Sequence, residues 1–238
     1  MSNYVVLNPA THQNTHVLTD RGEAQGDSIQ YALTYPLEFR NIQACYPIFF
    51  SKSSETGEFF PIALFGFEKN ENLFLDKAGW NASYIPMMVE RQPFLIGYQG
   101  SSEDDLKPIV SIDMDSPKIS QDQGQPLFEE QAQPSEYLKK VMTKLESLHH
   151  GHEHNKGFIA ALTAADLLEP FTLKITLDNG STNQLIGFYT INENKLLELD
   201  GATLADFNTK GYLQPIYMAV ASYARIRALI DKKNALLK

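Results

Sequence analysis

The feature that most constrains the fold is a set of short apolar segments in the first half of the chain, interrupted by Pro47, Gly57, Pro61 and Gly66. Segments of this length, rich in Phe and Ile, predict β-strands. Several are apolar throughout, so both faces of these strands need cover from helices or a second sheet. The predicted strands are Tyr46–Phe50, Phe60–Phe67, Asn72–Leu75, Phe94–Tyr98 and Ile109–Asp113.

The second half of the chain has helical periodicity and supplies this cover. Ser135 can cap a helix that ends at or near Gly151, and a second helix is predicted over 157–168. A short helix that Thr203 opens and a long terminal helix from near Pro215 complete the prediction.

Between the two predicted pairs of helices lies a hairpin. Apolar and polar residues alternate over 171–177, and the return strand covers 185–191. The intervening Asp178, Asn179 and Gly180 have the chemistry of a tight turn. We therefore predict an α+β fold with a mostly antiparallel sheet core, on which helices of the C-terminal half pack.

One segment, 115–135, differs in composition from the rest of the chain. It is rich in proline and glutamine, with a brief apolar island at Leu127 and Phe128. Such a composition favours a long surface connection. The prediction is a single domain over 1–238, with 115–135 as the candidate place for a sub-division.

Charge and cysteine content exclude some classes of function. The net charge of -9 predicts a surface that repels phosphate backbones, so nucleic acid is not an expected partner. The chain has one cysteine, Cys45, which cannot form an internal disulfide. Neither a secretory signal nor a membrane span is evident, and we expect a cytoplasmic protein.

Four histidines gather in the stretch LHHGHEHNKG, with Glu153 among them. Imidazole and carboxylate groups are ligands for zinc, nickel or copper, so His149, His150, His152 and His154 are the candidate metal ligands. Yet Gly151 weakens any helix there, and the favoured interpretation of the tract is a polar loop between helices with incidental metal affinity. Asp113 and Asp115, at a predicted strand end, are candidates for cation binding or acid–base chemistry.

The segment 78–97, AGWNASYIPMMVERQPFLIG, mixes aromatic, charged and proline residues. Its two prolines restrict the backbone, Trp80 and Tyr84 combine apolar faces with hydrogen-bond donors, and Arg91 offers a planar fork for a carboxylate. These residues predict either one wall of a binding surface or a core-lining segment with a structural arginine. The ligand-binding candidates are Trp80, Tyr84, Arg91 and Asp113.

Six segments occur in a recognisable order: YPIFF at 46–50, ALFGFEKNENLFLD at 63–76, GW..SYIPMMVERQPFLIG at 79–97, SIDMD at 111–115, G..LF at 124–128 and L.GFYTINENKL at 185–196. Together they resemble the SapC family of bacterial proteins. Glu90 and Gln92 stand where many relatives carry a basic residue and an aromatic one. The resemblance implies an association with surface-layer and outer-membrane systems, and it supplies no catalytic residue set that could be transferred to this chain.

Two functional hypotheses follow. The first is a non-catalytic cytoplasmic accessory protein that binds a peptide, a partner protein or a small ligand in a groove lined by Trp80, Tyr84 and Arg91. The second is a metal-dependent enzyme, an oxygenase or hydrolase, that uses the histidines of 149–154 with Asp113 or Asp115.

Overall fold

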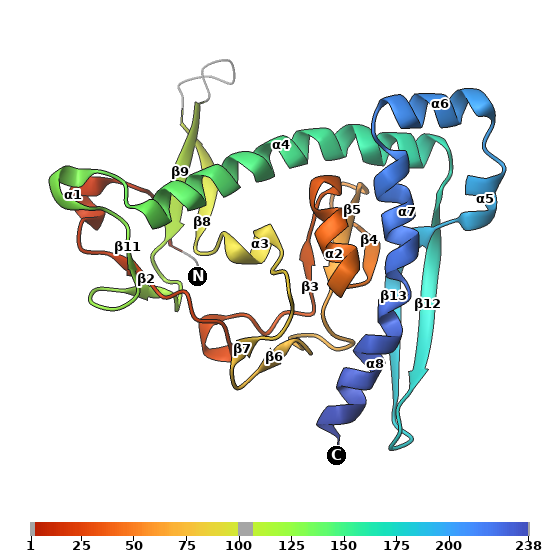
Figure 1. The fold of residues 1–238 in the computed structure, drawn as a ribbon, viewed down its shortest axis with the longest axis horizontal. Helices are drawn as coiled ribbons and strands as arrows, with labels where there is room; N and C mark the ends of the chain where they lie inside the picture. The colour runs from red at the N-terminus through yellow and green to blue at the C-terminus, as the bar shows by residue number, and fades with distance from the viewer. Residues whose placement is uncertain (1–2, 100–106, 238) are drawn as a thin grey trace. The chain divides into compact units, whose positions relative to one another are not determined.

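A computed structural model describes residues 3–99 and 107–237 of the chain (Figure 1). The chain forms two compact units, each built from two stretches of sequence. Unit 1 comprises Met1–Asp27 and Met87–His150, and unit 2 comprises Ser28–Pro86 and Gly151–Lys238. Sheets in both units are antiparallel and are accompanied by helices, which confirms the predicted α+β class. The segment 115–135 lies within unit 1, and the prediction of a single domain stays a prediction.

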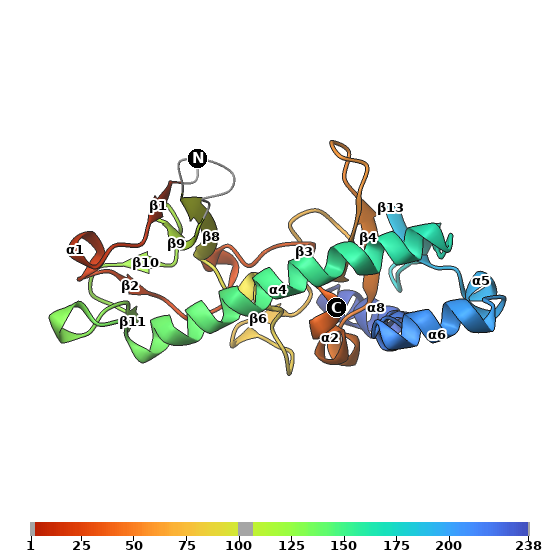
Figure 2. The ribbon, with the colours of Figure 1, turned by 90° about the horizontal axis from the view of Figure 1, so that it is seen from above.

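Unit 1 contains two small antiparallel sheets. The first has the strand order β1-β9-β8 and the second has the order β10-β2-β11. Figure 2 shows β1, β9 and β8 side by side. The strands are β1 (Tyr4–Val6), β2 (His16–Val17), β8 (Phe94–Gln99), β9 (Lys107–Asp113), β10 (Ile119–Ser120) and β11 (Gln125–Pro126). The short helices are α1 (Pro9–His12), η1 (Glu23–Gln25), α3 (Met87–Glu90) and η4 (Glu130–Ala132).

The core of unit 1 forms between these sheets and the first half of the long helix α4 (Glu136–Ala164). Ser135 caps this helix, because its hydroxyl accepts from the backbone N–H of Leu138 at 3.1 Å. The apolar side chains of α4 recur at helical spacing and meet Phe94 and Ile112 from the paired strands β8 and β9. The buried residues of this core are Val17, Phe94, Ile112, Leu127, Phe128, Leu138, Val141 and Leu145.

Unit 2 is built on a five-stranded antiparallel sheet with the order β12-β13-β4-β5-β3. Helix α7 packs against β4 and β13 and against helix α2, so the apolar strand β4 is covered as its sequence requires. The strands of unit 2 are β3 (Tyr31–Leu33), β4 (Ile48–Lys52), β5 (Phe59–Leu64), β6 (Leu75–Asp76), β7 (Gly79–Trp80), β12 (Leu168–Thr176) and β13 (Thr182–Ile191). The helices are η2 (Pro36–Glu38), α2 (Phe39–Cys45), α5 (Glu193–Leu197), α6 (Gly201–Thr209), α7 (Leu213–Ser222) and α8 (Arg225–Leu236).

The two helices predicted around the histidine tract are a single helix, and this is the main correction to the secondary structure. Helix α4 runs without a break through His149–His154 and Gly151. A Cβ at position 151 would collide with Leu37 and press on Tyr35, so glycine there permits close packing and does not end the helix. Gly157 likewise faces the hydroxyl of Tyr212. The cost of glycine in a helix, about 1 kcal/mol, is offset by this packing.

The single terminal helix predicted from Pro215 is also wrong, because the chain turns at Tyr223 and Ala224 between α7 and α8. The ring of Tyr223 stacks on Phe49, and its hydroxyl accepts from the N–H of Ile191 at 2.9 Å. These contacts lie where the two helices divide, although the backbone angles of Tyr223 and Ala224 remain helical. The predicted hairpin at 171–191 is confirmed, with β12 and β13 paired from Leu168↔Ile191 to Thr176↔Thr182.

The predicted strand Asn72–Leu75 is mostly loop, and β6 begins only at Leu75. The reason is local: the side chain of Asn72 accepts from the N–H of Phe74 at 3.0 Å, which forms a turn where the apolar pattern suggested a strand. Among the described residues, no helix has the length and apolar character needed to cross a bilayer.

Candidate functional site

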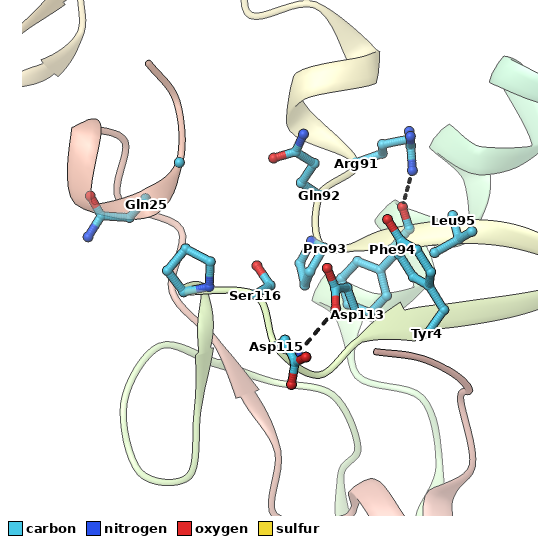
Figure 3. A pocket seen from close by; sticks show the side chains of 12 residues that line it. Tyr4, Gln25, Arg91, Gln92, Pro93, Phe94, Leu95, Asp113, Asp115 and Ser116 are labelled. Carbon is cyan, nitrogen blue, oxygen red and sulfur yellow. Dashed lines mark hydrogen bonds between the residues drawn. The ribbon is translucent and has the colours of Figure 1, made fainter. Parts of the chain in front are cut away.

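Unit 1 contains a cavity of about 560 Å³ that brings together two of the predicted ligand-binding residues. Its wall combines the segment after α3, the start of β8 and the turn after β9. Figure 3 shows Arg91 and Gln92 on one side, with Asp113 and Asp115 across Pro93 and Phe94. Tyr4, Gln25 and Ser116 add further polar groups to the lining.

Arg91 is positioned by backbone hydrogen bonds on both sides. Its N–H donates to the carbonyl of Met87 at 2.8 Å and thereby closes the turn of α3, and its own carbonyl accepts from the N–H of Phe94 at 2.8 Å. The guanidinium donates to the carbonyl oxygen of Phe94. This bond holds the guanidinium at the cavity wall.

Asp113 ends β9, where it pairs with Tyr4 of β1. Its Oδ1 accepts from the N–H of Asn3 at 2.9 Å and from the N–H of Asp115 at 3.2 Å. Its own N–H donates to the carbonyl of Pro93 at 3.0 Å, which ties this strand end to the segment that carries Arg91. Backbone donors thus hold the carboxylate in place at the end of β9.

The cavity offers both signs of charge. Arg91 can donate a pair of hydrogen bonds to a carboxylate, whereas Asp113 and Asp115 can accept from an ammonium or an amide N–H. A ligand that carries an acid and a hydrogen-bond donor, as peptides and amino acids do, matches this arrangement. Cys, Ser or His side chains in the geometry of a nucleophile and its base are not among the residues described along this wall.

Next to the cavity lies a buried ion cluster that the sequence did not reveal. Asp27 and Lys118 are each only 1% exposed, and they follow the cavity-lining residues Gly26 and Pro117 directly in the chain. The carboxylate of Asp27 lies 3.4 Å from Nζ of Lys118 and 3.3 Å from Nη1 of Arg21. Burial, reinforced by the charge of Arg21, lowers the pKa of Lys118. No sequence pattern pairs residues 91 positions apart, so this cluster could be found only in the structure.

Trp80 and Tyr84 lie in unit 2, where their polar atoms are engaged by other residues of that unit. The indole N–H of Trp80 donates to the hydroxyl of Tyr46 at 2.8 Å, and that hydroxyl donates to the carbonyl of Tyr84. The hydroxyl of Tyr84 donates to Oε1 of the buried Glu38 at 2.7 Å. Burial raises the pKa of Tyr46, so its hydroxyl stays protonated as a donor.

These contacts divide the four predicted ligand-binding residues. Arg91 and Asp113 line one cavity in unit 1, whereas Trp80 and Tyr84 belong to a hydrogen-bonded aromatic cluster in unit 2. Trp80 also packs edge-on against Phe65, with 5.2 Å between the ring centres. The donor-plus-apolar character that singled out the aromatic residues is used here for internal packing.

The four candidate metal ligands lie along helix α4 and make separate contacts. Nδ1 of His149 lies 3.3 Å from the hydroxyl of Tyr98, with the ring of His150 beside that of His149. The ring of His152 contacts Tyr35, and that of His154 contacts Tyr212. Over residues 3–99 and 107–237, no three His, Cys, Asp or Glu side chains gather in a way that could hold a metal ion. The structure therefore lends the metal hypothesis no support.

The order of motifs and the fold can now be set beside known proteins. A family model described as SapC matches residues 7–229, which is nearly the whole of the 238-residue chain. The chain belongs to the SapC family. The SapC match spans both units and includes Arg91 and Asp113. No curated protein and no solved structure matches the chain.

Proposed function

We propose that this SapC-family chain is a non-catalytic accessory protein that binds a peptide or a similar small ligand in the cavity of unit 1. The observation that supports the proposal is that Arg91, between α3 and β8, and Asp113, at the end of β9, carry opposite charges and line one cavity. Its volume of about 560 Å³ lies in the range of small-ligand sites.

Each group has a role in this proposal. Arg91 binds the carboxylate of the ligand through a planar pair of N–H donors. Asp113, held by the N–H groups of Asn3 and Asp115, accepts from an ammonium or amide of the ligand. The rigid backbone around both residues lowers the ordering cost of binding, because little has to be fixed when the ligand arrives.

The proposal extends to the setting in which the protein acts. We propose that it acts in the cytoplasm, as predicted from the sequence, and that it is an accessory to surface-layer or outer-membrane systems, as the SapC resemblance implies. Cell fractionation with an antibody against the native chain tests the location. Recovery in the membrane or extracellular fraction would contradict it.

The binding test uses calorimetry with a panel of tripeptides that have free termini and a matched panel with amidated C-termini. Free-carboxylate peptides are expected to bind, and amidation or Arg91→Ala is expected to weaken their affinity by at least about tenfold, the value of a charge-assisted hydrogen bond. Asp113→Asn is expected to weaken binding of peptides with a free amine more than that of acetylated ones.

A matched control is Arg227→Ala, which removes an arginine from the exposed face of α8 in unit 2. It is expected to leave every affinity unchanged. Equal binding of free and amidated peptides, or binding that Arg91→Ala does not alter, would refute the role given to this cavity.

A further inference from the structure

Unit 2 contains a second, larger cavity that is independent of the first. It measures about 830 Å³ and lies between the β4–β5 hairpin and the second half of helix α4. Leu33, Phe59, Phe60 and Ile159 provide apolar walls, and Lys52 and His152 contribute polar edges. A concave site of this size with mostly apolar walls and a few polar groups is the usual form of a small-molecule site.

One buried polar group marks the chemistry of this cavity. Asn155 lines it from helix α4 and is only 7% exposed. Its Oδ1 has no hydrogen-bond partner within the described residues, although buried amide oxygens almost always have one. Because Asn155 lines the cavity, an N–H or O–H group of a bound molecule is the partner that this acceptor would take.

The surroundings favour a ligand that is otherwise apolar. Phe59 and Phe60 present aromatic faces, and Nζ of Lys52 already lies over the ring of Phe59, 5.1 Å from its centre. Lys156 is paired with Glu153 at 2.8 Å. These two cations are therefore engaged by other groups of the protein, and Asn155 offers a buried acceptor beside the apolar contacts.

We propose that this cavity, which we call the Asn155 site, binds a largely apolar small molecule that donates one hydrogen bond to Oδ1 of Asn155. An aromatic amine or a phenol has this chemistry. The Asn155 site lies wholly in unit 2 and shares no residue with the cavity of Arg91 and Asp113.

The test is a fluorescence titration with N-phenyl-1-naphthylamine, which has an N–H donor, and with its N-methyl derivative, which has the same rings without that donor. The wild-type chain is expected to bind the first probe saturably, with one site, and to bind the second at least about fivefold more weakly, as for one lost neutral hydrogen bond. Asn155→Leu is expected to abolish this preference, because it removes the acceptor and keeps the apolar volume.

Two further variants complete the test. Ala160→Phe, at an exposed position of α4 that lines the cavity, is expected to abolish binding of both probes by filling the space. Asn208→Leu, the same substitution at an exposed position of α6, is expected to change nothing. Circular dichroism checks that each variant is folded. If Asn155→Leu does not fold, Ala160→Phe tests in its place whether the probes bind in this cavity.

The proposal is overturned if the wild-type chain shows no saturable binding, or if the preference for the N–H probe persists in Asn155→Leu. It is equally overturned if both probes bind the wild-type chain with the same affinity, as when Oδ1 bonds to water. Arg91→Ala is expected to leave these titrations unaltered, so failure here and failure of the peptide proposal are distinguishable.

Discussion

The two ends of one segment, residues 78–97, serve different purposes although their composition is similar. At the first end, Trp80 and Tyr84 bond to Tyr46 and Glu38 within unit 2. At the second end, Arg91 lines a cavity in unit 1 that Asp113 and Asp115 also line. The division of the chain falls between these ends, after Pro86.

The difference lies in what surrounds each polar atom. The indole N–H and the tyrosine hydroxyls point into a cluster whose hydroxyl and carboxylate acceptors are half-buried or buried, so they contribute to folding. The guanidinium, with one donor on the carbonyl of Phe94, stands at the edge of a cavity with carboxylates across it. Residue type alone therefore does not separate a binding role from a structural one.

Trp80→Ala has the largest expected effect. Removal of the ring exposes Phe65 and leaves the hydroxyl of Tyr46 without its donor, at a cost of about 3 kcal/mol in the free energy of unfolding. Urea unfolding measures this change. Tyr217→Ala, at a side chain that is 52% exposed, is the control and should cost less than about 0.5 kcal/mol. If the two variants are equally stable, Trp80 does not have the structural role described for the first end of the segment.

Tyr84→Phe tests the same structural role by removing a single oxygen atom. The variant keeps the ring and removes the hydroxyl that donates to Glu38, whose side chain is 1% exposed. Loss of a donor to a buried carboxylate is expected to cost about 2 kcal/mol. The same measurement on Tyr98→Phe, where the side chain is 53% exposed, should show little change. If the free energy of unfolding of Tyr84→Phe equals that of the wild-type chain, the hydroxyl of Tyr84 does not contribute to folding, which would contradict its structural role.

The pH dependence of the free energy of unfolding tests whether unit 1 also contains a buried tyrosine hydroxyl. Burial raises the pKa of Tyr137 to about 12, from 10.0. The folded state favours the neutral form, so this contribution is complete below pH 10 and is lost as the pH rises from 10 to 12. We expect a loss of about 1 to 2 kcal/mol that Tyr137→Phe removes.

The control for this titration comes from the other buried tyrosines. Tyr46 and Tyr223 also have raised pKa values and contribute in the same direction, so only the difference between the wild-type chain and Tyr137→Phe is informative. Parallel stability curves from pH 9 to 12 would show that the hydroxyl of Tyr137 is as well solvated in the folded state as in the unfolded one.

The sequence allowed the correct prediction of the parts governed by local patterns. Alternation and a turn of Asp178, Asn179 and Gly180 located the β12–β13 hairpin, and apolar runs located β4, β5, β8 and β9 to within a few residues. Pattern reasoning failed where distant contacts decide. Gly151 in the sequence predicted a helix end, but in the structure Leu37 and Tyr35 pack against it inside a continuous helix.

The candidate site shows the same limit. A strand-end aspartate and an arginine between prolines were identifiable from residue type and position, but their common cavity was not. The partners of Trp80 and Tyr84 lie 34 and 46 residues away in the chain, and the pair Asp27 and Lys118 is separated by 91 residues. Because such pairings depend on how the strands assemble, no local sequence signal could have assigned these side chains to the interior.

The central claim, that position 91 faces an open cavity, is tested most directly by the rate at which a thiol placed there reacts. In a Cys45→Ala background, which removes the only native thiol, Arg91→Cys is treated with a disulfide reagent. Exposed Lys139→Cys and buried Ser111→Cys serve as references. We predict a rate within about tenfold of the exposed reference and at least about 100-fold above the buried one, which reacts only through local opening. A rate equal to that of Ser111→Cys would contradict the account.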